Sequence, residues 1–283
     1  MIENVVFSSG GVMGPAFVGV FKYLFENNLH TTIKNYIGCS VGSLMCLAIT
    51  LGYSYKEMEG ISLGMNVKKL VNDENNILGI IDKYGFDDGA YLIKIVKILI
   101  KKKTNNQDIT FKEHYEMFKK KLIVVACNIN TYQDEYFNYI TTPDMKIWEA
   151  IRMSCSIPLV FTPYKYNDNF YVDGGLNNPC PCYYFKNQNK TLIFILESNI
   201  VERIECNDFK SYLTNLIFYR IRNQKSKKRK RKNCITIMLD NFDYENGFDI
   251  SIETRKKFIE KGYNTTKELL PSIIENLEKK SVR

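Results

Sequence analysis

Short apolar runs alternate with amphipathic stretches along the first two hundred residues of the chain. Apolar runs at 4–7, 33–37, 121–128 and 190–196 have the length and bulky composition of buried strands. Stretches at 41–51 and 90–103, and one ending near residue 28, have the apolar content and spacing of helices. With 283 residues, the chain fits one α/β domain with additions better than two domains.

Weaker patterns complete the expected elements. Extended segments are predicted at 135–139 and 234–239, and helices at 208–223 and 252–279, the last with a break at Pro271. Residues 67–86 look irregular, with short helical pieces. We expect a main domain over 1–200 and an extension of helix and strand over 201–283 that packs on the same domain.

A serine lies between two glycines where an expected strand meets an expected helix. The sequence there is Gly38-Cys39-Ser40-Val41-Gly42, the spacing of a nucleophile elbow. A serine in such a strained turn leaves no room for side chains two positions away, and glycine removes that conflict. Helix N–H groups from Val41 onward point to where negative charge develops in acyl transfer. The pattern predicts Ser40 as a nucleophile, with Val41 supplying part of an oxyanion hole.

A glycine-rich turn follows the first expected strand and precedes the first expected helix. Its sequence is Ser9-Gly10-Gly11-Val12-Met13-Gly14, and backbone amides at such a turn can point at an anion. A dinucleotide-binding turn would occupy the same position. Here, however, the first two glycines are adjacent, and 29–36 holds no Asp or Glu to bind a ribose. An oxyanion loop is therefore favoured over a nucleotide-binding loop.

An aspartate ends another apolar strand and is followed by two glycines, Asp173-Gly174-Gly175. Alone, this sequence is more typical of a hairpin turn. A serine nucleophile needs a base, however, and the two histidines, His30 and His114, do not lie at the end of an expected core strand. The simplest remaining mechanism is a dyad in which Asp173 accepts the Ser40 proton and returns it to the leaving alkoxide.

Taken together, these motifs resemble the patatin-like lipid acyl hydrolases. The matching segments, 9–14, 38–42, 150–158 and 173–175 with Asn178-Pro179, follow the family's order and cover about residues 1–185. The resemblance implies Ser40 as nucleophile, Asp173 as base, and the amides of Gly10 and Gly11 as oxyanion donors. It also implies a three-layer α/β/α fold with a mainly parallel sheet, a lipid substrate, and no metal or organic cofactor.

The chain departs from the family pattern in its oxyanion loop. Ser9 stands where the family usually has a third glycine, and Met13, followed closely by Pro15, replaces the usual Arg or Lys. A cation beside the oxyanion is therefore absent. The alternative interpretation is a catalytically impaired relative that binds lipid, and a nucleotide-binding protein is a weaker third.

The cysteines bear on the cellular compartment of the protein, and a long uncharged stretch bears on whether the chain crosses a membrane. The 8 cysteines are scattered and form no metal-ligand set with histidines, which favours reduced, buried thiols and a cytosolic protein. Residues 35–55 carry no charge and could span a bilayer, but their glycines, serines and tyrosines favour a buried strand, turn and helix.

Two basic features contribute to the net charge of +8. Helix 91–101 carries Lys94, Lys97 and Lys101 on one stripe beside a broad apolar arc, which suits either a packed helix or one lying on a membrane. The run at 225–232 suits a solvated loop, anionic lipid headgroups, or nuclear import and nucleic acid. Aromatic residues do not interleave the run, so specific nucleic-acid binding is not indicated. We expect a cytoplasmic enzyme that contacts anionic membranes peripherally, with nuclear localisation left open by this run and the oligomeric state unpredicted.

Overall fold

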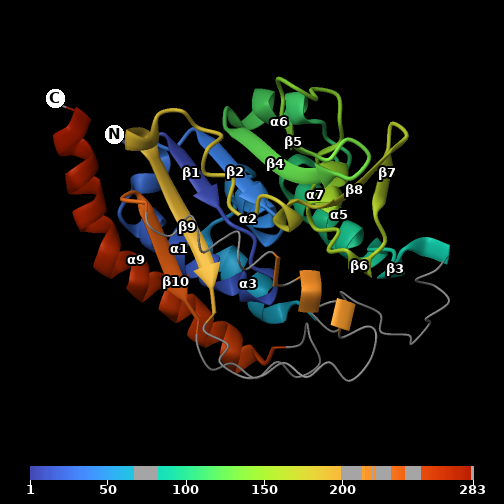
Figure 1. Ribbon diagram of the computed structural model, residues 1–283. Coiled ribbons are helices and arrows are strands. Elements are labelled where there is room, and N and C mark those ends of the chain that lie inside the picture. Colours follow the sequence, from blue (N-terminus) through green and yellow to red (C-terminus); the bar gives the residue numbers. More distant parts are fainter. Residues whose placement is uncertain are drawn as a thin grey trace.

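The computed structural model describes residues 1–66, 82–198, 212–213, 215–217, 219–220, 231–239 and 250–281. Within these residues the central sheet has eight strands (Figure 1). Its parallel strands lie in the order β10 (Cys234–Met238), β9 (Thr191–Glu197), β1 (Asn4–Phe7), β2 (Asn35–Cys39) and β4 (Lys121–Asn128). The antiparallel members are β5 (Gln133–Phe137), β7 (Tyr164–Tyr166) and β8 (Asn169–Asp173). A separate parallel pair joins β3 (Gly85–Asp87) to β6 (Leu159–Phe161).

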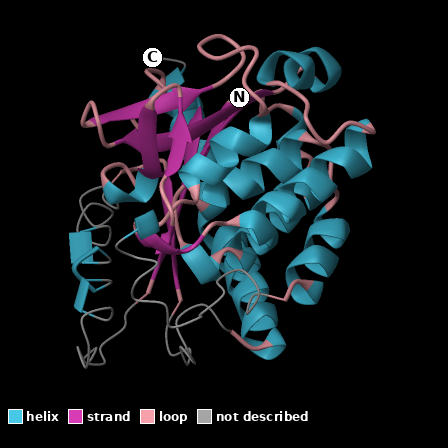
Figure 2. Cartoon of the chain, turned by 90° about the vertical axis from the view of Figure 1, so that its right-hand side faces the viewer, coloured by secondary structure: helices cyan, strands magenta, loops and turns pink. Residues whose placement is uncertain are grey.

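Helices flank this sheet and lie mainly towards one of its faces (Figure 2). They are α1 (Pro15–Glu26), α2 (Val41–Thr50), α3 (Tyr55–Gly64), α5 (Ala90–Thr104), α6 (Phe111–Phe118), α7 (Ile147–Ser154) and α9 (Ile252–Ser281). Alternate strand residues face two cores, since side chains of a strand point to opposite sides. Phe7 and Val124 face the larger core with α1, α2, α7 and α9, whereas Val6 and Val125 face a smaller one. The predicted α/β fold with a mostly parallel central sheet is confirmed.

The described strand and long helix after residue 200, β10 (Cys234–Met238) and α9 (Ile252–Ser281), pack against the first part of the chain. Strand β10 extends the sheet beside β9, and α9 crosses α1 closely, since a Cβ on Gly262 would collide with the carbonyl of Ala16. The expected break at Pro271 is wrong, because α9 runs through it. Pro271 is exposed while Leu270 and Leu277 are buried on either side of it, so packing maintains the helix despite the lost hydrogen bond.

Some of the segments expected from the sequence lie outside the described residues. Most of the expected helix 208–223 and residues 225–230 of the basic run lie outside them. The uncharged stretch 35–55 forms β2, the following turn and α2, largely buried as predicted. Across the described part of the chain, no helix is both long and apolar enough to cross a membrane. All seven described cysteines are free thiols, and six of them are buried.

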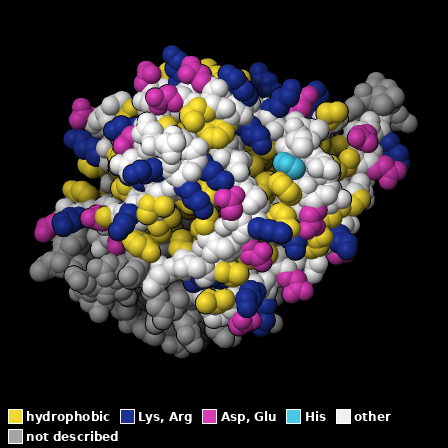
Figure 3. Space-filling view, turned by 180° about the vertical axis from the view of Figure 1, so that it is seen from behind, with side chains coloured by type: hydrophobic (Ala, Val, Ile, Leu, Met, Phe, Trp, Pro, Cys, Tyr) yellow, Lys and Arg dark blue, Asp and Glu magenta, His cyan; other side chains and the backbone are white. Residues whose placement is uncertain are grey.

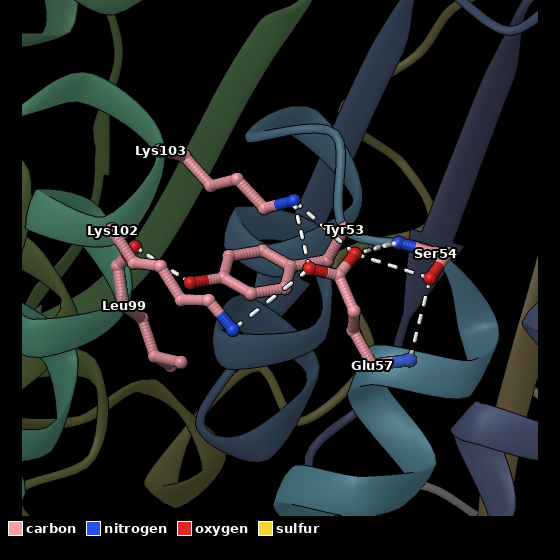
Figure 4. A network of polar contacts seen from close by, with 6 residues as sticks. All are labelled: Tyr53, Ser54, Glu57, Leu99, Lys102 and Lys103. Atoms are coloured by element: carbon pink, nitrogen blue, oxygen red, sulfur yellow. Dashed lines mark hydrogen bonds and ion pairs between the residues drawn. The ribbon is translucent and has the colours of Figure 1, made fainter.

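Lysines of α5 contact other parts of the protein (Figure 4). Lys103 donates to Glu57 of α3 at 3.0 Å, and Lys102 approaches the same carboxylate at 3.9 Å. The Ser54 backbone N–H and then Lys103 lower the pKa of Glu57 to about 2. Lys97 of the expected stripe likewise pairs with Asp108 at 3.4 Å. Much of the positive charge of α5 is thus engaged within the protein.

Candidate active site

The serine of the predicted elbow has a strained backbone. Ser40 lies between β2 and α2 with φ 55° and ψ −126°, outside the regions that residues other than glycine favour. A Cβ on Gly38 would collide with the backbone of Gly42, and one on Gly42 would collide with the carbonyl groups of Phe7 and Ser8. The close approach of these backbones therefore requires glycine at both positions.

The glycine-rich loop lies over the start of α2. A Cβ on Gly14 would collide with the Val41 side chain, and Gly11 adopts a positive φ of 54°. Among the described residues, the N–H groups of Gly10, Gly11 and Val41 donate no recorded hydrogen bond. Three unpaired N–H groups near an elbow can stabilise an oxyanion.

Residues that depart from the family pattern fit this loop without distorting it. Pro15 is the first residue of α1, where its missing N–H is not needed and its fixed φ suits the helix. The Met13 side chain is 8% exposed and packs in the larger core. Position 13 thus contributes to packing in this chain.

Strand register brings the aspartate to the elbow. Val125 of β4 pairs with Cys39 of β2, Ala126 pairs with Asp173 of β8, and both β4 residues also pair with β5. A strand residue pairs with one neighbour on each edge, so β5 takes one edge and β2 and β8 share the other. The carboxyl ends of β2 and β8 therefore meet head to head, and Ser40 follows directly at that meeting point.

Side-chain contacts agree with this register. Cys39 Sγ lies 3.9 Å from Asp173 Oδ1, which also accepts the Gly175 N–H at 2.7 Å. Burial raises the pKa of the Cys155 thiol and the nearby charge of Asp173 raises it further, while hydrogen bonds with Ser43 and Ser40 oppose that rise. Cys155 thus neighbours both candidate dyad residues, which are themselves buried.

Neither histidine takes part in this cluster. His114 Nε2 pairs with the hydroxyl of Thr50 at 3.0 Å, at the far end of α2 from Ser40, about 15 Å along a ten-residue helix. The His30 ring stacks on Phe25, with 4.5 Å between centroids. The structure thus gives no support to a histidine as the base.

The burial of His114 predicts a pH-dependent stability. Burial, and to a lesser degree the charge of Lys120, lower the pKa of His114 to about 4. Between the unfolded value near 6.5 and this folded value, the unfolded chain binds a proton that the folded chain excludes. We expect His114 to cost about 3 kcal/mol of unfolding free energy as pH falls from 7 to below 4, since one pKa unit corresponds to about 1.4 kcal/mol.

Denaturant unfolding of the wild type and His114→Gln between pH 7 and pH 4 measures this contribution. The substitution keeps an N–H donor for Thr50 and removes the titrating ring, so the variant should lose less stability over this range. Carboxylates contribute equally to both proteins and cancel in the difference. Parallel curves for the two proteins would contradict the prediction.

The sequence predicts no role for the side chains of the matching segment 150–158. In the structure, Ser154 at the end of α7 accepts the backbone N–H of Ser40 at 2.9 Å, and the carbonyl of Ser156 accepts the N–H of Asp173 at 2.8 Å. Ser154 lies 114 residues from Ser40, so no local spacing could have indicated the contact.

Within the described residues, no group of three or more His, Cys, Asp or Glu side chains could hold a metal.

Comparison with known proteins identifies the family. Residues 5–186 match the model of the family described as "Patatin-like phospholipase", which is more than half of the chain. This chain belongs to the patatin-like phospholipase family. It is 35% identical over 187 residues to the probable lipid hydrolase 463L of Invertebrate iridescent virus 6, covering 63% of this chain and 61% of that protein. It is also 27% identical over 159 residues to the triacylglycerol lipase SDP1L of Arabidopsis thaliana, covering 56% of this chain and 19% of that lipase.

Solved structures share the fold. VipD from Legionella pneumophila matches with a TM-score of 0.66 at 18% identity, over 96% of this chain and 67% of VipD. The type III effector ExoU matches with a TM-score of 0.59 at 14% identity, over 96% of this chain and 53% of ExoU. The patatin-like chain therefore spans only part of these proteins and about three fifths of the viral lipid hydrolase. The family description and the names of two relatives refer to the hydrolysis of lipids.

Proposed function

We propose that this patatin-like protein hydrolyses carboxylic esters of lipids through an acyl-enzyme on Ser40, with Asp173 as the general base. The proposal rests mainly on the head-to-head meeting of β2 and β8 on one edge of β4, which brings a strained serine beside a buried carboxylate. The names of the lipid hydrolase and lipase relatives support a lipid ester as substrate.

In the proposed first half-reaction, Ser40 Oγ attacks the ester carbonyl and Asp173 takes the hydroxyl proton. The N–H groups of Gly10, Gly11 and Val41 stabilise the oxyanion of the tetrahedral intermediate. The intermediate then collapses, the bond to the leaving alkoxide breaks, and Asp173 returns the proton to that oxygen. The second half-reaction repeats these steps with water, from which Asp173 takes a proton, and it ends with the free acid and the Ser40 hydroxyl.

The catalytically impaired alternative loses its main support. This alternative rests on Met13 and Pro15, but Pro15 suits the first turn of α1 and Met13 packs in the core. The loop amides need no charged side chain to donate hydrogen bonds to an oxyanion.

A fluorophosphonate probe tests the proposed function. Such a probe phosphonylates an activated serine, so we expect stoichiometric labelling of the folded protein, with the adduct mapped to Ser40 by peptide mass spectrometry. Heat-unfolded protein is the control and should remain unlabelled, because only the folded elbow activates the serine. A folded protein that binds lipid vesicles and takes up no probe would support the impaired alternative.

Peripheral contact with anionic membranes, at a cytoplasmic location, remains part of the proposal. Lys94 and Lys101 of α5 are exposed and have no recorded ion pair among the described residues. On the face seen in Figure 3, however, Lys and Arg side chains are interspersed with Asp and Glu. Membrane attraction by cations fades as salt shortens the Debye length. Co-sedimentation with anionic vesicles that does not weaken with salt would rule out this electrostatic contact.

A further inference from the structure

The turn that ends α7 contacts both candidate dyad residues. The Ser154 hydroxyl donates to the carbonyl of Val125 at 2.6 Å and accepts the N–H of Ser40 at 2.9 Å. Two residues on, the Ser156 carbonyl accepts the N–H of Asp173 at 2.8 Å. Both serines are fully buried. One short turn therefore carries hydrogen bonds to the backbones of the proposed nucleophile and the proposed base.

The direction of each Ser154 hydrogen bond is determined by its partners. A carbonyl can only accept and a backbone N–H can only donate, so the single hydroxyl proton of Ser154 points to Val125 and a lone pair points to Ser40. Without this hydroxyl, the buried N–H of Ser40 would lose its recorded acceptor and the carbonyl of Val125 would lose one donor, and a buried donor without an acceptor disfavours the conformation that leaves it so. The hydroxyl thus bridges the elbow to the strand beside which Asp173 lies.

A buried arginine holds the same turn in place. The Arg152 guanidinium donates to the Ser156 hydroxyl and to the carbonyls of Asp88 and Thr162, each of the latter at 2.9 Å. Its side chain is 1% exposed, and the Ser156 hydroxyl donates back to the Arg152 carbonyl at 2.7 Å. The turn is therefore anchored to the residues that directly follow β3 and β6, independently of the elbow.

We infer that Ser154 is a positioning residue, whose hydroxyl holds the strained backbone of Ser40 in register with Asp173 by bridging it to Val125. A strained φ of 55° persists only where the surroundings determine it, and Ser154 supplies the contact to the N–H of that residue. This contact also occupies the Ser40 N–H, which leaves the oxyanion to the amides of Val41, Gly10 and Gly11. The inference rests on the proposed function, because positioning matters only if Ser40 is the nucleophile.

The test compares Ser154→Ala and Ser154→Thr with a matched control. Thr266 is also fully buried, and its hydroxyl donates to a helix carbonyl, that of Gly262, at 2.7 Å. Thr266→Val removes one buried hydroxyl from α9 without touching the elbow. The readouts are the second-order rate constant of fluorophosphonate labelling, kcat and KM on a soluble short-chain ester, and the thermal unfolding midpoint.

We expect Ser154→Ala to slow labelling and lower kcat by about 10- to 100-fold with little change in KM, as small misplacements of a reacting group do. Ser154→Thr keeps the hydroxyl and should recover most of the rate. Thr266→Val should lower the unfolding midpoint yet label at the wild-type rate. If Ser154→Ala does not fold, Ser154→Cys replaces it, since its weaker hydrogen bonds should also slow labelling.

The outcomes distinguish a failure of the proposed function from a failure of the positioning role of Ser154. Wild-type protein that is not labelled at Ser40 would overturn the proposed function. Labelled wild type together with Ser154→Ala, or Ser154→Cys in its place, reacting at the wild-type rate would overturn only the positioning role. A rate loss in Ser154→Thr equal to that in Ser154→Ala, with the unfolding midpoint of Ser154→Thr unchanged from wild type, would also overturn it, because the added methyl then fits and the bridging hydroxyl is irrelevant.

Discussion

Replacement of Ser40 by alanine is expected to abolish fluorophosphonate labelling and to lower ester turnover by at least about 10⁴-fold. The substitution removes the only atom that attacks the carbonyl in the proposed reaction, and leaves the loop amides in place. The fold should persist, because the backbone contacts of residue 40 with Ser154 and Ser43 do not involve the deleted oxygen. Initial rates on a soluble ester, with unfolding curves for both proteins, measure the effect.

Ser272→Ala is a matched control for this experiment. The Ser272 hydroxyl donates to the carbonyl of Leu269 on the exposed side of α9, so its loss should leave turnover and labelling unchanged. If Ser40→Ala kept wild-type turnover on the soluble ester, the elbow would not carry the nucleophile.

Replacement of Asp173 by asparagine is expected to lower turnover by about 10³-fold or more, because an amide cannot accept the serine proton. The side chain keeps its shape, and its oxygen can still accept the Gly175 N–H that now bonds Oδ1 at 2.7 Å. The unfolding midpoint should therefore change little compared with the loss in rate. Steady-state kinetics across pH 5–9 measures both kcat and its dependence on the base.

Two controls accompany the Asp173 variant. Asp134 lies on β5, which pairs with the edge of β4 opposite β8, and its Oδ1 accepts the side-chain amide of Asn177 at 3.1 Å. Asp134→Asn should stay within a few-fold of wild type, which separates loss of the base from loss of nearby negative charge. If His30→Ala or His114→Ala, rather than Asp173→Asn, abolished turnover, a histidine would replace Asp173 as the base.

The Ser40 and Asp173 variants and the Ser154 variants test different roles within the same site. The substitutions at Ser40 and Asp173 remove the groups that exchange a proton, whereas those at Ser154 change only how the backbone of the elbow is held in place. Loss of a reacting group should remove the reaction, while loss of a positioning group should slow it and spare KM. A graded set of rates therefore distinguishes the reacting residues from their support.

Local chemistry made the elements and the elbow predictable from sequence. Bulky apolar runs mark β1 and β4, whose predicted bounds agree with the structure. Gly38 and Gly42 mark the elbow. The conflict that Gly38 avoids arises within a few residues of Ser40, whereas the one that Gly42 avoids comes from Phe7 and Ser8 at the end of β1. The roles of Ser40 and Asp173 remain predictions until the variants are measured.

The helix through Pro271 and the pairing of α5 lysines were decided by packing. A proline lowers helix propensity wherever it occurs, but Leu270 and Leu277 bury the helix on both sides of it. The stripe that includes Lys97 suits either a packed helix or one lying on a membrane, and in the structure Asp108 and Trp148 reach Lys97 from elsewhere in the chain. Contacts of this kind depend on which elements become neighbours, and sequence periodicity does not contain that information.

By itself, the sequence determined many of the strands and helices, but not α3 or α7. It also determined where a strained serine turn could form and which carboxylate ends a strand. Only the tertiary structure decided that β8 follows β2 on the same edge of β4, and that Ser154 bridges Ser40 to Val125. The physical reason is the separation along the chain over which each kind of interaction acts. Steric and hydrogen-bonding preferences act between near neighbours in the chain, whereas the buried hydroxyl contacts of Ser154 join residues 29 and 114 positions apart, and burial of the common core sets both these contacts and the strand register.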